Sequence, residues 1–311
     1  MDSRSGAEEH ADGPLARVLW SGLIALGRVT GPGVARTIAA VVLRIASRTP
    51  TGYRRSMLRV ARRTPLPLPN LTRLPMAWWT YRPHVQACRL GLRFDLDLRD
   101  NLQRTLYFTG RYEPALTDLL LREVRRGDVV LDIGAHIGVH ALVTARRLRD
   151  LGGGRVIAVE PTPDSVAALR RVAVRHGLRV RVVEMAFGRQ NGVVPIRADP
   201  EYGDADAGVR SQFTTGTTVT CALVVTLDDW AEHDGPDRLD IIKIDVEGAE
   251  PDVLAGATRS LRRYRPRLVV VEVKDRILAR AGTDAEAVRR PLREAGYRCD
   301  GVVDGNEVWR A

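Results

Sequence analysis

The sequence predicts an α/β fold in which a mostly parallel β-sheet is covered by helices on both faces, preceded by a basic helical N-terminal extension. From residue 113 onward, short apolar segments of strand length alternate with segments whose apolar residues recur at helical spacing. This alternation is typical of parallel sheets, because each parallel strand needs a crossover, usually a helix, before the next one. We expect strands at residues 128–133, 155–160, 179–185, 239–245 and 267–274.

The segments between these strands support the same architecture. Helices are predicted at residues 116–126, 137–149 and 164–176, because their apolar residues line one face. Residues 198–218 are rich in Gly, Asp, Ser and Thr and are predicted to form a mobile loop. Near the C-terminus, Asp304-Gly305 is a dipeptide typical of tight turns, so residues 297–309 are expected to form a hairpin.

The first third of the chain differs in charge from the rest. The net charge is +10, and residues 1–100 alone hold sixteen arginines against seven acidic residues. Four prolines in residues 64–76 indicate an extended linker. We therefore divide the chain into a basic helical extension with its linker, residues 1–76, and a main domain, residues 77–311. Because nearly all basic residues are Arg, coding bias explains their use as well as phosphate recognition does, and nucleic acid is not the expected partner.

Residues 14–63 contain two apolar stretches that charged residues and a Gly-Pro-Gly turn interrupt. Neither reaches the roughly 20 apolar residues of a spanning helix. They fit two short amphipathic helices, packed on the main domain or in peripheral contact with a membrane. The first thirteen residues lack the basic character of a signal peptide, and Cys88, Cys221 and Cys299 are scattered. A cytoplasmic location, with membrane association left open, is expected.

A ligand site is predicted where the first two strands end. An apolar strand runs into Gly134, which permits a tight turn, and Gly138 permits close packing of the following helix. The G-x-x-x-G spacing lacks the pattern of a pyrophosphate loop. Glu160 ends the second strand, where it can accept hydrogen bonds from ribose hydroxyls, so an adenosine compound without phosphates is indicated. Glu184 and Met185, at the end of the third strand, would border the adenine or, as the alternative, form a solvated strand end.

The chain resembles the FkbM-type methyltransferase family in its motifs DIGAHIG (132–138), EPTP (160–163), TLDDW (226–230), KIDVEGAE (243–250) and VLAGA (253–257). The resemblance implies the class I methyltransferase fold, which is Rossmann-like. It also implies S-adenosyl-L-methionine as donor, and O-methylation of a hydroxyl on a sugar, glycolipid or secondary metabolite. Carried over by position, Gly134, Ala135 and Gly138 would line the methionine portion and Glu160 the ribose.

Four further residues complete the predicted cofactor site. Asp132, His136 and Pro161 belong to the same motifs, and Glu113, just before the first core helix, would close over the donor together with Tyr112. His136 is a departure, because the family usually shows Asn at this position. A neutral imidazole can still donate or accept one hydrogen bond, so binding is expected to survive.

Charged residues in and after the strand around Lys243 indicate the catalytic edge. Ligands of open α/β sheets bind beyond the carboxyl ends of the strands, so Asp245 is the first candidate for the base or for orienting the acceptor, and Glu247 the second. No His accompanies them in sequence, so no metal is expected, although the two carboxylates could hold a divalent cation. Lys243 is expected to pair with Glu272 on a neighbouring strand. His140 is interpreted as packing and Glu250 as structural.

The expected partner is a small-molecule or glycan hydroxyl acceptor. A nucleic-acid methyltransferase using the Arg-rich arm is an alternative, but the Asn/Asp-Pro-Pro-aromatic motif usual in enzymes that flip a base is replaced here by DVEG at residues 245–248. An oxidoreductase would need the missing pyrophosphate loop. A non-catalytic protein that binds an adenosine compound is the remaining alternative.

Overall fold

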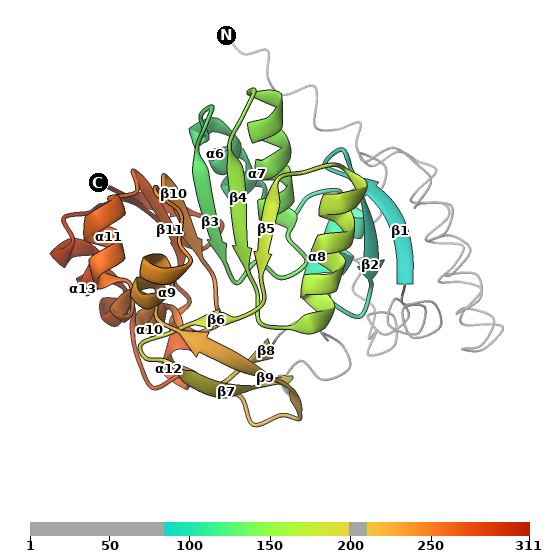
Figure 1. The fold of residues 1–311 in the computed structure, drawn as a ribbon. Coiled ribbons are helices and arrows are strands. Elements are labelled where there is room, and N and C mark those ends of the chain that lie inside the picture. The colour runs from blue at the N-terminus through green and yellow to red at the C-terminus, as the bar shows by residue number, and fades with distance from the viewer. Residues whose placement is uncertain (1–83, 199–209) are drawn as a thin grey trace, which may run out of the picture. The chain divides into compact units, whose positions relative to one another are not determined.

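The computed structural model describes residues 84–198 and 210–311, which form two compact units (Figure 1). The first unit holds β1 (His84–Arg89), the end of β2 (Leu92–Asp97) and α5 (Asn101–Thr109). Asp100 caps α5 by accepting the Gln103 backbone N–H. The second unit, Leu90–Asp95 with Tyr112–Ala311, contains every predicted site residue. The expected boundary at residue 76 and the helices expected in residues 14–63 lie outside the described residues.

The second unit is built on a seven-stranded sheet in the order β12-β13-β11-β10-β3-β4-β5. Five of its strands run parallel: β3 (Val129–Ile133), β4 (Arg155–Val159), β5 (Val180–Val183), β10 (Ile241–Ile244) and β11 (Leu268–Glu272). All residues of β3, β10 and β11 are buried, as expected for strands covered on both faces. The predicted parallel sheet is confirmed.

The hairpin predicted at the C-terminus is also confirmed. β12 (Arg298–Val303) and β13 (Asn306–Arg310) pair antiparallel, and β13 pairs with β11. Asp304 and Gly305 both have positive φ angles, 48° and 86°, as a tight two-residue turn requires. The Asp304 carboxylate accepts the backbone N–H groups of Ala115 and Leu116, at the start of α6 (Pro114–Glu123).

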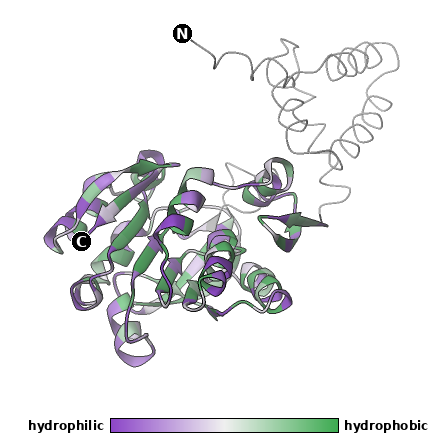
Figure 2. Ribbon diagram, turned by 90° about the horizontal axis from the view of Figure 1, so that it is seen from above, coloured by the Kyte–Doolittle hydropathy of each residue, from purple (hydrophilic) through white to green (hydrophobic). Residues whose placement is uncertain are grey.

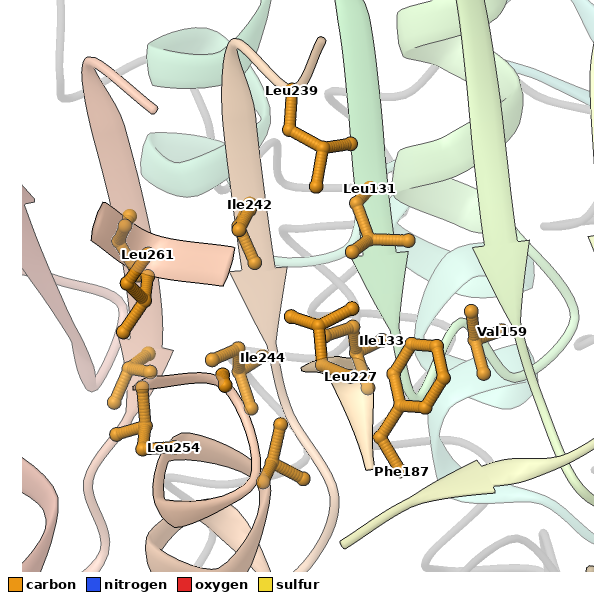
Figure 3. Close-up of a cluster of buried hydrophobic side chains, with 14 of the residues drawn as sticks. Leu131, Ile133, Val159, Phe187, Leu227, Leu239, Ile242, Ile244, Leu254 and Leu261 are labelled. Carbon is orange, nitrogen blue, oxygen red and sulfur yellow. The ribbon is translucent and has the colours of Figure 1, made fainter. Parts of the chain in front are cut away.

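Helices cover both faces of this sheet. One face packs against α9 (Leu227–His233), α10 (Glu250–Ala255), α11 (Thr258–Tyr264) and α13 (Ala285–Glu294), with α12 (Asp275–Arg280) alongside. Their apolar residues form one cluster with alternate residues of the strands, among them Leu131, Ile242 and Leu254 (Figure 3). The other face packs against α6 (Pro114–Glu123), α7 (Val139–Asp150) and α8 (Pro163–Arg175). Figure 2 shows hydrophobic residues concentrated in the strands between these layers.

A second, four-stranded sheet in the order β6-β9-β7-β8 follows β5. It comprises β6 (Ala186–Phe187), β7 (Gly192–Ala198), β8 (Arg210–Ser211) and β9 (Thr218–Val225). The loop predicted over residues 198–218 is therefore wrong at residues 210–211, which pair with β7. Tertiary pairing overrides the local composition there; residues 199–209 are not described.

Candidate active site

Most of the predicted site residues gather at the carboxyl ends of β3, β4 and β10; Glu184 and Met185 follow β5, and Glu113 precedes α6. The turn after β3 touches the loop after β10 directly: a Cβ on Gly134, whose φ is 77°, would lie 1.8 Å from the Asp245 carbonyl oxygen. A Cβ on Gly138 would lie 2.5 Å from Leu169 Cγ on α8. Both glycines are therefore required by close approach of protein to protein, which brings the two loops of the site into contact.

His136 occupies the same turn in the left-handed region, with φ 51°. Asn, Asp and His are the non-glycine residues that tolerate this conformation best, so His fits where the family usually shows Asn. The His136 N–H donates to Glu160 Oε2 at 2.9 Å. The turn after β3 and the end of β4 are thus fastened together.

Glu160 is 6% exposed, and one of its two carboxylate oxygens already accepts two hydrogen bonds. Its Oε1 accepts the Thr162 N–H at 2.9 Å and the Thr162 hydroxyl. Among the described residues, Oε2 accepts only the His136 backbone N–H, which leaves one lone pair for a ligand hydroxyl. Sequence reasoning did not single out Thr162. Its hydroxyl would have to turn away from Glu160 Oε1 before that oxygen could accept a second ligand hydroxyl. Pro161 lies between these two residues, and its ring fixes its own φ angle.

The two residues predicted to border the adenine differ in surroundings. Met185 is partly buried against the apolar cluster of the sheet. The Glu184 carboxylate is 41% exposed and forms an ion pair with Arg170 of α8 at 3.2 Å. An adenine contact from either residue stays a prediction.

Lys243 is the centre of a buried charge network. Its Nζ lies 3.1 Å from Asp245 Oδ2 and 3.5 Å from Asp132 Oδ1, and its side chain is 3% exposed. The expected pair with Glu272 is wrong, because Lys243 stands in register with Asp132 on β3. Glu272 instead pairs with Lys274. Both β3 and β11 neighbour β10, and the register decides: Lys243 stands opposite Asp132 on β3 but opposite Val270 on β11, two residues before Glu272.

The charges of this network act oppositely on the two catalytic candidates. Burial would raise the pKa of Asp245, but Lys243 and Lys274 outweigh it, so the pKa is lowered. Burial and the Asp245 charge raise the pKa of Glu247 to about 7. Burial and the same charge raise the pKa of Glu272 to about 9. At neutral pH, Asp245 is therefore an anion and Glu247 is near its midpoint.

The loop that carries both residues is held in an unusual conformation. Glu247 has a φ of 54°, a left-handed conformation uncommon for a non-glycine residue, and Gly248 follows at 104°. Glu250, 2% exposed, accepts the N–H groups of Val246 at 2.9 Å and Gly248 at 3.0 Å. Ser211 of β8, 4% exposed, donates its hydroxyl to the Glu247 carbonyl at 2.9 Å. Sequence reasoning missed Ser211, because a serine in a polar segment carries no distinguishing pattern.

Two buried polar atoms beside this network lack hydrogen bonds. Glu113 Oε2 and His140 Nε2 lie 3.7 Å apart, and neither has a hydrogen-bond partner among the described residues. Burial and the Asp245 charge raise the pKa of Glu113 to about 7. Burial, then Lys243, lowers the pKa of His140 to about 3, so its imidazole is neutral. The Tyr112 ring lies 6.0 Å from that of His140.

Three acids could be considered for a cation. Asp245, Glu250 and Glu272 bring possible ligand atoms within 4.8 Å of one another, so Glu247 is not part of this group. Glu250 already accepts backbone N–H groups, Glu272 pairs with Lys274 and Asp245 pairs with Lys243. Their protein partners account for the cluster.

None of the helices described is long and apolar enough to cross a membrane.

A seven-stranded sheet of this order, with helices on both faces and the site at its carboxyl edge, is the fold of class I methyltransferases. Residues 132–299 match the model of the methyltransferase FkbM domain, more than half of the sequence. The chain belongs to this family.

Curated relatives carry related names. The chain is 28% identical over 185 residues to the hexuronic acid methyltransferase AglP of Haloferax volcanii, covering 60% of this chain and 70% of the relative. It is 34% identical over 181 residues to the 31-O-demethyl-FK506 methyltransferase FkbM of Streptomyces tacrolimicus, covering 49% and 68%. The 2-O-methyltransferase NoeI of Sinorhizobium fredii is 30% identical over 152 residues, covering 44% and 60%.

Among solved structures, the methyltransferase FkbM from Methylobacillus flagellatus KT is 16% identical, with a TM-score of 0.42. The match covers 67% of this chain and 52% of that one.

Proposed function

We propose that this chain is an S-adenosyl-L-methionine-dependent O-methyltransferase acting on a hydroxyl of a sugar, glycolipid or secondary metabolite. The observation that carries the proposal is that two acids of different character lie at the carboxyl edge of the sheet: Asp245 is ion-paired with Lys243, and the pKa of Glu247 is raised. The names of the relatives, which include a hexuronic acid methyltransferase and a 2-O-methyltransferase, support a hydroxyl as acceptor.

The residues present fit the donor. Glu160 retains an acceptor site for a ribose hydroxyl, and the turn of residues 134–138 follows β3 with left-handed conformations at Gly134, His136 and Gly138. Glu113 Oε2 and His140 Nε2, buried and without partners in the part of the chain that the structure describes, suit a group rich in N–H donors, such as the ammonium of the methionine portion. When bound, the donor supplies a methyl group on a positively charged sulfur.

The chain's own residues then have separate tasks. Asp245 stays ionised beside Lys243 and, as a weak base, is suited to accepting a hydrogen bond from the acceptor hydroxyl and orienting it. Glu247 is the better match for the general base, because a base with a pKa near the working pH combines availability with strength. This order of roles reverses the expectation from sequence. Acidic groups around the site also favour the cationic donor over its neutral product.

The proposal includes a cytoplasmic location and a small-molecule or glycan as the methyl acceptor. Cys88, Cys221 and Cys299 are free and exposed, which suits a reducing compartment. A screen of glycosides and of polyketide or peptide alcohols with methyl-labelled donor would identify the acceptor.

The donor site is tested by calorimetry with S-adenosyl-L-methionine. Glu160→Ala should weaken binding at least about tenfold, because hydrogen bonds to a charged group are lost. The matched control is Glu286→Ala, an exposed acid of α13 that is tied to Arg293 and lies outside the predicted site, which should bind within about threefold of the parent. Parental affinity in Glu160→Ala, or no binding by the parent, would refute the assignment.

A further inference from the structure

The edge of the large sheet opposite the candidate active site concentrates arginines. The amino ends of β3, β4, β5, β10 and β11 meet there (Figure 1). Two hollows of about 570 and 580 Å³ open at this edge. Residues 126–129 contribute to both, so the hollows are neighbours. Their volumes lie within the range of small-molecule sites.

The first hollow holds more positive charge than its own acids neutralise. Its charged lining residues are Arg125, Arg126, Asp128, Arg238, Asp240, Arg265 and Arg267. Arg267 Nη1 bonds to Asp128 Oδ1 at 3.2 Å, and Arg238 Nε bonds to Asp240 Oδ2 at 2.9 Å. The side chains of Arg125, Arg126 and Arg265 make no hydrogen bond or ion pair with a described residue.

The second hollow repeats this imbalance. It is lined by Arg155, Arg179 and Arg181, and no acidic residue of the described part of the chain lines it. Arg181 pairs with Asp234 outside the lining. The side chains of Arg155 and Arg179 form no such pair within residues 84–198 and 210–311. Five guanidinium groups that form no ion pair with a described residue therefore surround two adjoining hollows.

General Arg usage does not explain this local excess. Residues 101–311 are nearly balanced, with 32 basic and 31 acidic residues, yet the two described acids that line these hollows, Asp128 and Asp240, are each bonded to an arginine. Like charges held close together repel, and a multivalent anion relieves that repulsion. The planar guanidinium group binds phosphate oxygens through two parallel hydrogen bonds.

We propose that this edge is a second binding site, for a ligand that carries two or more phosphate groups, and that it is separate from the methyl-transfer site. The phosphates lie one in each hollow or on the shared wall of residues 126–129. A soluble polyphosphate and the headgroups of an anionic lipid surface offer the same chemistry. The proposal does not depend on the identity of the methyl donor or acceptor.

The test uses two probes on the full chain. Inorganic pyrophosphate is titrated by calorimetry, and sedimentation is measured with vesicles of phosphatidylglycerol in phosphatidylcholine against phosphatidylcholine alone. At least one probe should bind, more weakly as NaCl is raised. The variant Arg125→Ser/Arg126→Ser should weaken that binding about tenfold or more. Both side chains are exposed, so the melting temperature should stay near that of the parent.

The matched control is Arg62→Ser/Arg63→Ser, another adjacent pair of arginines, from the basic N-terminal part of the sequence. Binding that is kept in this control and lost in Arg125→Ser/Arg126→Ser supports the site. Pyrophosphate binding then identifies a soluble ligand, and binding to vesicles alone identifies a lipid headgroup. The proposal is overturned if neither probe binds, if Arg125→Ser/Arg126→Ser binds as the parent does, or if both pairs of substitutions weaken binding equally.

Discussion

Asp245 and Glu247 are two residues apart, yet their carboxyl groups meet opposite electrostatic surroundings. Asp245 lies 3.1 Å from a buried ammonium group, which stabilises its charge. Glu247 faces burial and the negative charge of Asp245, which favour its protonated form. Pairs of titratable groups whose surroundings separate their pKa values commonly divide acid–base and electrostatic roles between them. The two residues therefore call for different tests.

Glu247→Gln should lower kcat by about 10²–10⁴-fold, because the group that removes the acceptor proton is lost. The KM for the donor should change by less than about threefold. In the parent, kcat should rise with pH and level off above about 7, since only the carboxylate form of Glu247 acts as base. Full activity in Glu247→Gln, with the pH limb unchanged, would exclude Glu247 as the base.

Asp245→Asn provides the comparison. It removes the anion paired with buried Lys243, so the free energy of unfolding should fall by about 3–5 kcal/mol. Denaturant unfolding of both variants separates this loss from the catalytic one, because Glu247→Gln should remain nearly as stable as the parent. A stable, fully active Asp245→Asn would contradict the role given to the ion pair.

At the scale of the element, the loop between β10 and α10 is shaped by contacts from elsewhere in the chain. Glu250 holds its backbone from one side, and Ser211 of the small sheet holds the Glu247 carbonyl from the other. A left-handed non-glycine conformation costs about 1–3 kcal/mol and persists only when its surroundings enforce it. β8 is thereby a positioning element for Glu247.

Ser211→Ala should reduce kcat about tenfold while leaving donor affinity unchanged, because the loop can relax and misplace the base. The acid limb of the pH profile should move toward lower pH as Glu247 becomes better solvated. Ser211→Thr keeps the hydroxyl and should restore both. Ser260→Ala, an equally buried serine on α11, controls for the loss of packing. Equal changes in kcat and in the pH profile for Ser211→Ala and Ser260→Ala would contradict the positioning role of Ser211.

At the scale of the whole molecule, acidic residues predominate at the carboxyl end of the large sheet and arginines at its amino end. The carboxyl edge collects Asp132, Asp245, Glu247, Glu250 and Glu272, and the amino edge collects the arginines of the two hollows. Concentrating acids in one buried region raises the pKa of several of them. This separation has a consequence for stability as well as for binding.

The free energy of unfolding should fall as pH rises from about 5 to about 9. Glu272 has a pKa of about 9 when folded, and Glu250 about 7, both above their ordinary value, so the folded state holds more protons in this window. Their contribution is complete below the unfolded pKa and is lost as pH passes through the folded pKa. Urea unfolding across this pH range should show that the free energy of unfolding declines less steeply in Glu272→Gln than in the parent. An increase in parental stability with pH would contradict this prediction.

The parts of the fold that could be read from sequence depend on local patterns. The apolar strands, the glycine turn at Gly134 and the Asp304-Gly305 hairpin each follow from a few adjacent residues. The partner of Lys243 could not be read in this way, because it depends on which strand lies beside β10 and in which register. Thr162 and Ser211 were missed because nothing in their sequence surroundings distinguishes them from other hydroxyl residues.

By itself, the sequence determined the parallel architecture, the family and the segments that form the carboxyl edge, because periodicity and turn chemistry are properties of adjacent residues. Only the tertiary structure decided which charges pair, which of Asp245 and Glu247 keeps its proton near neutral pH, and where arginines lack acids. These depend on distances between residues far apart in the chain, since both Coulomb energies and the cost of burial are set by position in space.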